Sequence, residues 1–169
     1  AHDMPAGLHA DWNDCLRMGA KGESTFVAFQ LYYAMRVIRD MAQQRGDSEY
    51  VAYIDDIQAK LGASLEKCWD EDRFIRGIRE DGVVVGAKKD PEASMWLNPQ
   101  SWAVISGFAS KDQAKQSMES VHRILNTPYG IKLLDPPYRA HYFDGALMHI
   151  FNPDTKENGG IFSQSQGWA

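Results

Sequence analysis

Apolar residues recur at helical spacing in two long stretches of the first half of the chain. The first stretch begins at Ser24, a suitable N-cap, and stops at Gly46. Its apolar positions cover more than one face, so we expect this helix to be largely buried. Asp47 can cap a second helix that continues to Trp69. The short connection predicts an antiparallel helical hairpin.

The pattern then changes to short β-like runs over residues 73–78 and 83–85, separated by the turn-forming pair Asp81-Gly82. This arrangement predicts a small β-hairpin inserted between helices.

A second pair of helices is predicted after Pro99. The first helix covers about residues 100–108, and Ser110 with Gln113 forms a capping-box pattern before the next. Prolines and turn residues fill 128–153, and a further helix is predicted near Gly160. Helix pairs with long loops at one end indicate a mainly all-α fold of the toroid type.

Bulk composition excludes several classes of protein. The 169 residues are 44% hydrophobic, as in ordinary globular proteins. The chain has 18 Lys and Arg against 23 Asp and Glu and no block of like charges, so we expect no nucleic-acid partner. No apolar run approaches the roughly 20 residues of a membrane span. The two cysteines, Cys15 and Cys68, are not spaced like metal ligands, and the same holds for the five histidines. We therefore expect no metal site. A cytoplasmic protein is the simplest reading.

The ends of the chain indicate an excerpt. It begins at Ala1 without an initiator Met and stops at Trp168-Ala169 without a polar tail. We therefore expect residues 1–169 to be a single partial domain, unstable by itself.

Two polar segments carry the candidate chemistry. In the first, residues 9–14, Trp12 lies between Asp11 and Asp14, which suits a sugar because an indole packs on a pyranose while carboxylates bind hydroxyls. An Asp shielded by Trp also suits protonation of a departing glycosidic oxygen. The competing reading is structural, with Asn13 or Asp14 capping a turn and Trp12 in the core.

The second segment is 155–160, where Lys156 and Glu157 precede Asn158-Gly159-Gly160. These two charged residues can pair with each other, orient a sugar, or bind an anion together with the glycine-adjacent backbone N–H groups. The competing reading is structural, a solvated loop that turns into a helix. No GxGxxG, Walker A, GxSxG or HExxH pattern occurs, which removes the usual nucleotide, serine-hydrolase and zincin readings.

Five segments together, in this order, resemble glycoside hydrolase family 94. They are AGLHADWNDCL at 6–16, GES at 22–24, NPQSW at 98–102, DPPY at 135–138 and NPDTKENGGIF at 152–162. The resemblance implies an (α/α)6 barrel, of which this chain supplies the central to later helices.

The resemblance also implies roles for single residues. Asp14 matches the family's general acid. Trp12 matches a residue of the donor glucose subsite, and Asp11 beside it is a candidate sugar-binding residue. Lys156 and Glu157 match residues on the acceptor side of the cleft. Gln164 stands where the family carries a phosphate-binding His. Gln still donates a hydrogen bond but cannot carry a charge.

The implied activity is an inverting phosphorylase that cleaves a cellobiose-like β-glucoside with inorganic phosphate as co-substrate and no cofactor. The products would be α-glucose 1-phosphate and a released sugar. Residues 141–143 bear on whether the acceptor is glucose, gluconate or a cellodextrin. Two other classes stay open, an inverting hydrolase with Glu157 as base and a non-catalytic sugar-binding fragment. The partners are a saccharide and phosphate, and homodimers are common in the family.

Overall fold

The computed structural model describes residues 2–8, 11–139 and 150–169. The predictions that involve His9 and residues 141–143 lie outside these described residues. The helices are α1 (Thr25–Gln44), α2 (Ser48–Glu66), α3 (Leu97–Ile105), α4 (Lys111–Ile124) and α5 (Ser163–Gln166). The strands are β1 (Glu23–Ser24), β2 (Trp69–Asp70), β3 (Arg73–Phe74), β4 (Gly77–Ile78), β5 (Val84–Val85), β6 (Met95–Trp96), β7 (Asn126–Thr127), β8 (Gly130–Ile131) and β9 (Leu134–Asp135).

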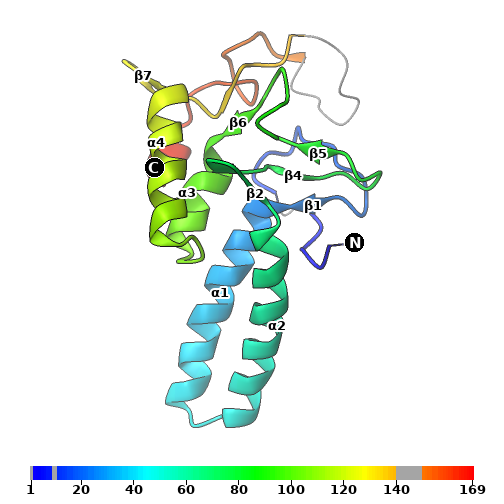
Figure 1. The fold of residues 1–169 in the computed structure, drawn as a ribbon, viewed down its shortest axis with the longest axis vertical. Coiled ribbons are helices and arrows are strands. Elements are labelled where there is room, and N and C mark those ends of the chain that lie inside the picture. The colour runs from blue at the N-terminus through cyan, green and yellow to red at the C-terminus, as the bar shows by residue number, and fades with distance from the viewer. Residues whose placement is uncertain (1, 9–10, 140–149) are drawn as a thin grey trace.

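The predicted hairpin of α1 and α2 is confirmed and is the longest feature of the molecule (Figure 1). The Ser24 hydroxyl accepts a hydrogen bond from the Val27 N–H at 3.2 Å, and the Asp47 carboxylate accepts one from the Tyr50 N–H at 3.0 Å. Gly46 turns the chain between the helices at φ +74°, a conformation that glycine adopts without strain. Local capping therefore determines where both helices begin.

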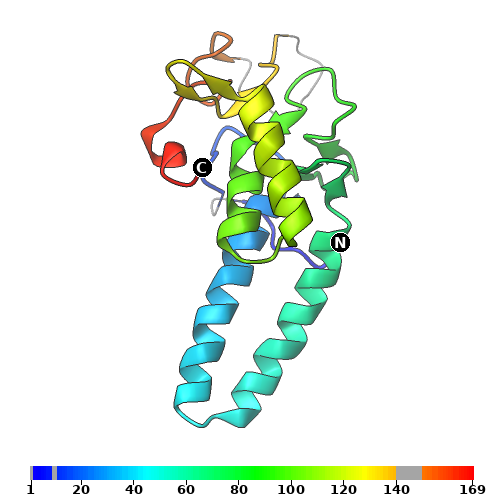
Figure 2. The same cartoon turned by 60° about the vertical axis from the view of Figure 1, so that its left-hand side comes forward.

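The expectation that the first helix is largely buried is wrong for its distal part. Phe26 and Phe29 are buried, whereas Met41 is 59% exposed. The reason is that α3 lies beside only the first part of α1, ending at the hydrogen bond from Arg36 to the Ser106 carbonyl (Figures 1 and 2). Beyond that level, α2 covers one side of α1 and the apolar residues of the other side remain exposed.

The second helical pair, α3 and α4, is also confirmed. Ser110 and Gln113 form the complete capping box, with Ser110 accepting from the Gln113 N–H at 3.2 Å and the Gln113 side chain accepting from the Ser110 N–H at 3.0 Å. α3 begins earlier than predicted, at Leu97, because Pro99 fits inside a first helical turn. The last helix, α5, is a single turn that begins after Gly160, at Ser163.

The prediction of one strand over 73–78 is wrong, because this stretch divides between two sheets. β3 pairs with β2, whereas β4 pairs with both β5 and β1. The predicted β4–β5 hairpin around Asp81-Gly82 is confirmed, with Gly77 opposite Val85. Within the described residues the strands form four small sheets, so the fold is mixed helix and small sheets, with more sheet than the one predicted hairpin and consistent with part of an α/α barrel domain.

The sheet β1-β4-β5 lies at the N-terminal end of α1 and supports the described parts of the N-terminal loop, residues 2–8 and 11–20 (Figure 1). Ala6 forms an isolated bridge with Glu23, and the Gly7 N–H donates to the Gly22 carbonyl at 3.0 Å. None of the helices in the described part of the chain is both long and apolar enough to span a membrane.

The N-cap of α2 gives a test of the hairpin in the full-length protein that contains this chain. Asp47→Ala removes the acceptor for the Tyr50 N–H and should lower the free energy of unfolding by about 1 kcal/mol. Asp56→Ala is the matched control, because Asp56 lies on the same helix and, among the described residues, makes only an exposed pair with Lys60. Thermal unfolding should separate the variants, and equal midpoints would contradict the capping role.

Candidate active site

The loop that carries Trp12 and Asp14 is anchored by a buried ion pair. The Asp11 carboxylate bonds the guanidinium of Arg76, and Ser24 donates to the same carboxylate at 2.5 Å. Arg76 is fully buried and donates to the Ser24 hydroxyl at 3.0 Å. Burial alone would raise the pKa of Asp11, but Arg76, Ser24 and the Asn13 backbone outweigh it and hold the pKa below its usual value.

Two successive side-chain turns connect this anchor to Asp14. Asp11 accepts the Asn13 N–H at 2.9 Å, and the Asn13 side chain accepts the Cys15 N–H at 3.2 Å. Such Asx turns hold a non-helical backbone without help from a sheet or helix. Asp14 is exposed, and its carboxylate makes no hydrogen bond to any residue that the structure describes. Its position therefore depends on the backbone turn.

A second loop, residues 152–160, is anchored by a neutral amide. Asn158 is fully buried, and its side chain donates to the Tyr138 and Phe151 carbonyls at 2.9 and 3.0 Å. It also accepts the Tyr138 N–H at 2.7 Å. One side chain thus satisfies three backbone groups and holds the loop closed.

The backbone of this second loop is tightly turned. Asp154 and Lys156 have φ values of +64° and +46°, which are uncommon for residues other than glycine. A Cβ on Gly160 would lie 2.5 Å from the Lys156 carbonyl oxygen, so only glycine fits there. Lys156 is exposed, and its ammonium lies 4.9 Å from the centre of the Phe151 ring.

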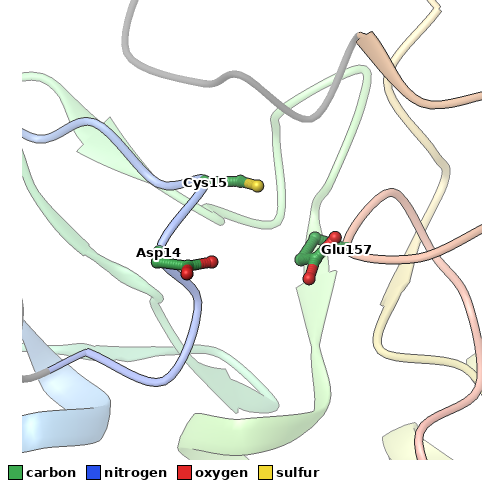
Figure 3. Close-up of side chains that lie close together, drawn as sticks. All are labelled: Asp14, Cys15 and Glu157. Carbon is green, nitrogen blue, oxygen red and sulfur yellow. The ribbon is translucent and has the colours of Figure 1, made fainter.

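The two loops meet at Asp14, Cys15 and Glu157. Figure 3 shows the side chains of Asp14 and Cys15 pointing from one loop toward Glu157 on the other. One oxygen of each carboxylate and the Cys15 sulfur lie within 4.8 Å of one another. Burial and the two carboxylates raise the pKa of the Cys15 thiol. These three side chains are also a group, among the described residues, that could ligate a metal ion.

Trp12 connects the first loop to the end of the chain. Its indole N–H donates to the Gln164 side chain at 2.8 Å, and its ring packs edge-on against Phe162 with centroids 4.8 Å apart. Trp168 lies 6.4 Å from Trp12 and 5.7 Å from Trp102 of α3. The aromatic contacts therefore continue from the loop into the helical core.

The structure brings together most of the residues predicted from the sequence. Asp14 and Glu157 are neighbours, as are Trp12 and Gln164, whereas Asp11 is buried away from the surface with both carboxylate oxygens bonded. Sequence analysis missed the structural role of Arg76. The available signal was a charged residue flanked by the apolar residues 74–75 and 77–78, but nothing local indicates which acid it contacts.

Comparison with known proteins decides the family. The model of the glycosyl hydrolase 94 superfamily catalytic domain matches residues 1–169. The chain belongs to this family.

Curated relatives in family 94 agree with the match. An N,N'-diacetylchitobiose phosphorylase of Vibrio furnissii is 35% identical over 169 residues, covering 96% of this chain and 21% of that protein. A cellobionic acid phosphorylase of Neurospora crassa is 35% identical over 159 residues, covering 92% of this chain and 20% of that protein. A 3-O-beta-D-glucopyranosyl-beta-D-glucuronide phosphorylase of Paenibacillus borealis is 30% identical over 167 residues, covering 96% of this chain and 22% of that protein. The chain thus spans about a fifth of the length of these relatives.

Breaking the buried ion pair should strongly destabilise the full-length protein. Asp11→Asn keeps the shape but leaves the Arg76 charge unpaired, and we expect a loss of about 3–5 kcal/mol in unfolding free energy. The matched control is Asp55→Asn, which breaks an exposed Asp–Arg pair with Arg39 and should change little. Denaturant unfolding measures both, and an equally small effect would show that the buried pair is not an anchor.

Gly160 gives an independent test of the second loop. Gly160→Ala forces the Lys156 backbone to move and should lower the unfolding free energy by about 1–3 kcal/mol. In Gly62→Ala, on α2, the new methyl group meets nothing closer than 3.8 Å and favours the helix, so stability should stay equal or rise. Thermal unfolding of both variants measures the difference, and a fully stable Gly160→Ala protein would contradict the packing of this loop.

Proposed function

We propose that the full-length protein is an inverting phosphorylase that cleaves a cellobiose-like β-glucoside with inorganic phosphate. The observation that carries this proposal is the meeting of Asp14 with Glu157 in a chain of family 94. Disaccharide phosphorylases among its relatives support the reaction class. We further propose that residues 1–169 are one partial domain, the central to later helices of an (α/α)6 barrel, in a cytoplasmic protein.

In this proposal Asp14 is the general acid. Its carboxylic acid transfers a proton to the glycosidic oxygen as the bond from that oxygen to the anomeric carbon breaks. An oxygen of phosphate bonds to the anomeric carbon from the opposite face, which gives α-glucose 1-phosphate and a free sugar. Phosphate is already anionic and needs no base, so one essential carboxylate is sufficient.

Glu157 is then a binding residue for the released sugar rather than a base. In inverting hydrolases the two carboxyl groups lie roughly 6.5–9.5 Å apart, because a water molecule must fit at the far face of the ring. Oxygens of Asp14 and Glu157 lie within 4.8 Å, which is closer than an inverting hydrolase needs for its water molecule. Lys156, next to Glu157 and exposed, supplies a second polar contact on the acceptor side.

Trp12 and Gln164 would form the donor and phosphate side. The Trp12 indole provides a flat face for the glucose ring. The Gln164 side-chain oxygen already accepts from Trp12, which leaves its amide nitrogen to donate to phosphate. Asp11 takes part through its anchoring of the loop. The relatives act on different acceptors, so glucose, gluconate and cellodextrins all need testing.

Phosphorolysis of cellobiose by the full-length protein tests the reaction and the acid together. We expect glucose 1-phosphate to form only with phosphate, and Asp14→Asn to reduce the rate by about 10²–10⁴-fold because the acid is lost. Asp112→Asn, an exposed carboxylate in the first turn of α4, is the control and should keep full activity. Proton NMR of the nascent product reports its anomeric form.

Three outcomes would contradict the proposal in different ways. Cleavage without phosphate would indicate a hydrolase. A β-configured glucose 1-phosphate would indicate net retention, with Glu157 as nucleophile at a spacing close to the roughly 5–5.5 Å of retaining pairs. Sugar binding without turnover on the whole acceptor panel would indicate a non-catalytic carbohydrate-binding protein.

A further inference from the structure

We propose that Arg76 is the positioning residue for the acid of this site, acting through Asp11 and the turn that carries Asp14. This inference rests on the proposed function, because it concerns the delivery of the Asp14 proton. It adds a fully buried residue that lies between β3 and β4, out of reach of a bound sugar or phosphate.

The first step is that, among the described residues, only the backbone turn positions the Asp14 carboxylate. Within the described residues this carboxylate makes no hydrogen bond, while its backbone carbonyl accepts from Arg17 at 2.7 Å. A proton donor must lie within hydrogen-bond reach of the oxygen that it protonates. A displaced turn would therefore move the Asp14 carboxyl group out of reach of the oxygen and slow the proton transfer.

The second step is that the turn depends on Asp11. One oxygen of Asp11 accepts the Asn13 N–H at 2.9 Å, and the Asp11 N–H donates to the Gly7 carbonyl at 3.1 Å. The same oxygen bonds Arg76. The guanidinium thus acts directly on the atom that begins the turn.

The third step is that Arg76 is itself held firmly. Its backbone N–H donates to the Val85 carbonyl at 2.8 Å, and its carbonyl accepts the Thr25 N–H at 3.3 Å. The guanidinium carbon lies 5.8 Å from the Phe26 ring centre and 5.2 Å from that of Trp96. A planar cation between two rings that bonds two oxygen acceptors is a geometry that Lys does not reproduce.

Arg76→Lys in the full-length protein, assayed on two substrates, tests this role. Cellobiose needs protonation of its leaving group, whereas 2,4-dinitrophenyl β-glucoside releases a phenolate that needs none. With phosphate and cellobiose we expect kcat to fall by about 10²-fold, as for a misplaced catalytic group, with KM nearly unchanged. With the dinitrophenyl substrate the same variant should stay within a few-fold of the unmodified protein.

Arg73→Lys is the matched control. Arg73 is also buried, but it bonds Asp72 and the Ser94 carbonyl rather than Asp11. Any loss in this variant should be equal on the two substrates. An Arg76→Lys protein that loses the same factor on both substrates would overturn the positioning role.

Asp14→Asn separates failure of this inference from failure of the proposed function. One outcome is that the Asp14 variant regains near-normal turnover on the dinitrophenyl substrate while the Arg76 variant does not. In that case the acid assignment stands and the positioning role is wrong. If the Asp14 variant does not regain activity on the dinitrophenyl substrate, the acid assignment itself is wrong.

If the Arg76→Lys protein does not fold, Ser24→Ala is the second test. It removes the hydroxyl that bonds both Arg76 and Asp11 without leaving a charge unpaired. A selective loss on cellobiose in that variant supports the inference, and an equal loss on both overturns it.

Discussion

The ion pair between Asp11 and Arg76 is the interaction on which the candidate site depends. Both groups are removed from water, which is tolerated only when the pair is bonded closely and further hydrogen-bond partners offset the lost hydration; among the described residues the Arg76 Nε has none. Ser24 supplies one such partner for each member, and it also caps α1. One hydroxyl therefore couples the start of the longest helix to the loop that carries Asp14.

The two loops of the site are held by different chemistry. The first is anchored by a buried charge pair, and the second by the neutral amide of Asn158 with three backbone partners. In both loops the anchor is buried, while Asp14 and Lys156 are exposed and Glu157 is partly buried. Buried residues therefore hold both loops, while the carboxylate of Asp14 makes no hydrogen bond to any described residue.

Aromatic packing joins the site to the helices. Trp12 contacts Phe162 and Trp168, and Trp168 in turn contacts Phe26 and Trp102. The single turn of α5 is thereby fixed against α1 and α3, although it is too short to be a stable helix by itself. Gln164 lies on this turn, so its hydrogen bond to Trp12 depends on the same packing.

The sequence by itself determined where α1, α2 and α4 begin, because the caps Ser24, Asp47 and Ser110 act on backbone groups three residues away. It also determined the family, since the motifs at 6–16 and 152–162 are continuous segments. Only the tertiary structure decided the division of 73–78 between two sheets, the exposure of the distal part of α1, and the meeting of Arg76 with Asp11 and of Glu157 with Asp14. Those features depend on contacts between segments far apart in the chain, and no local pattern of residues specifies which distant partner a side chain will find.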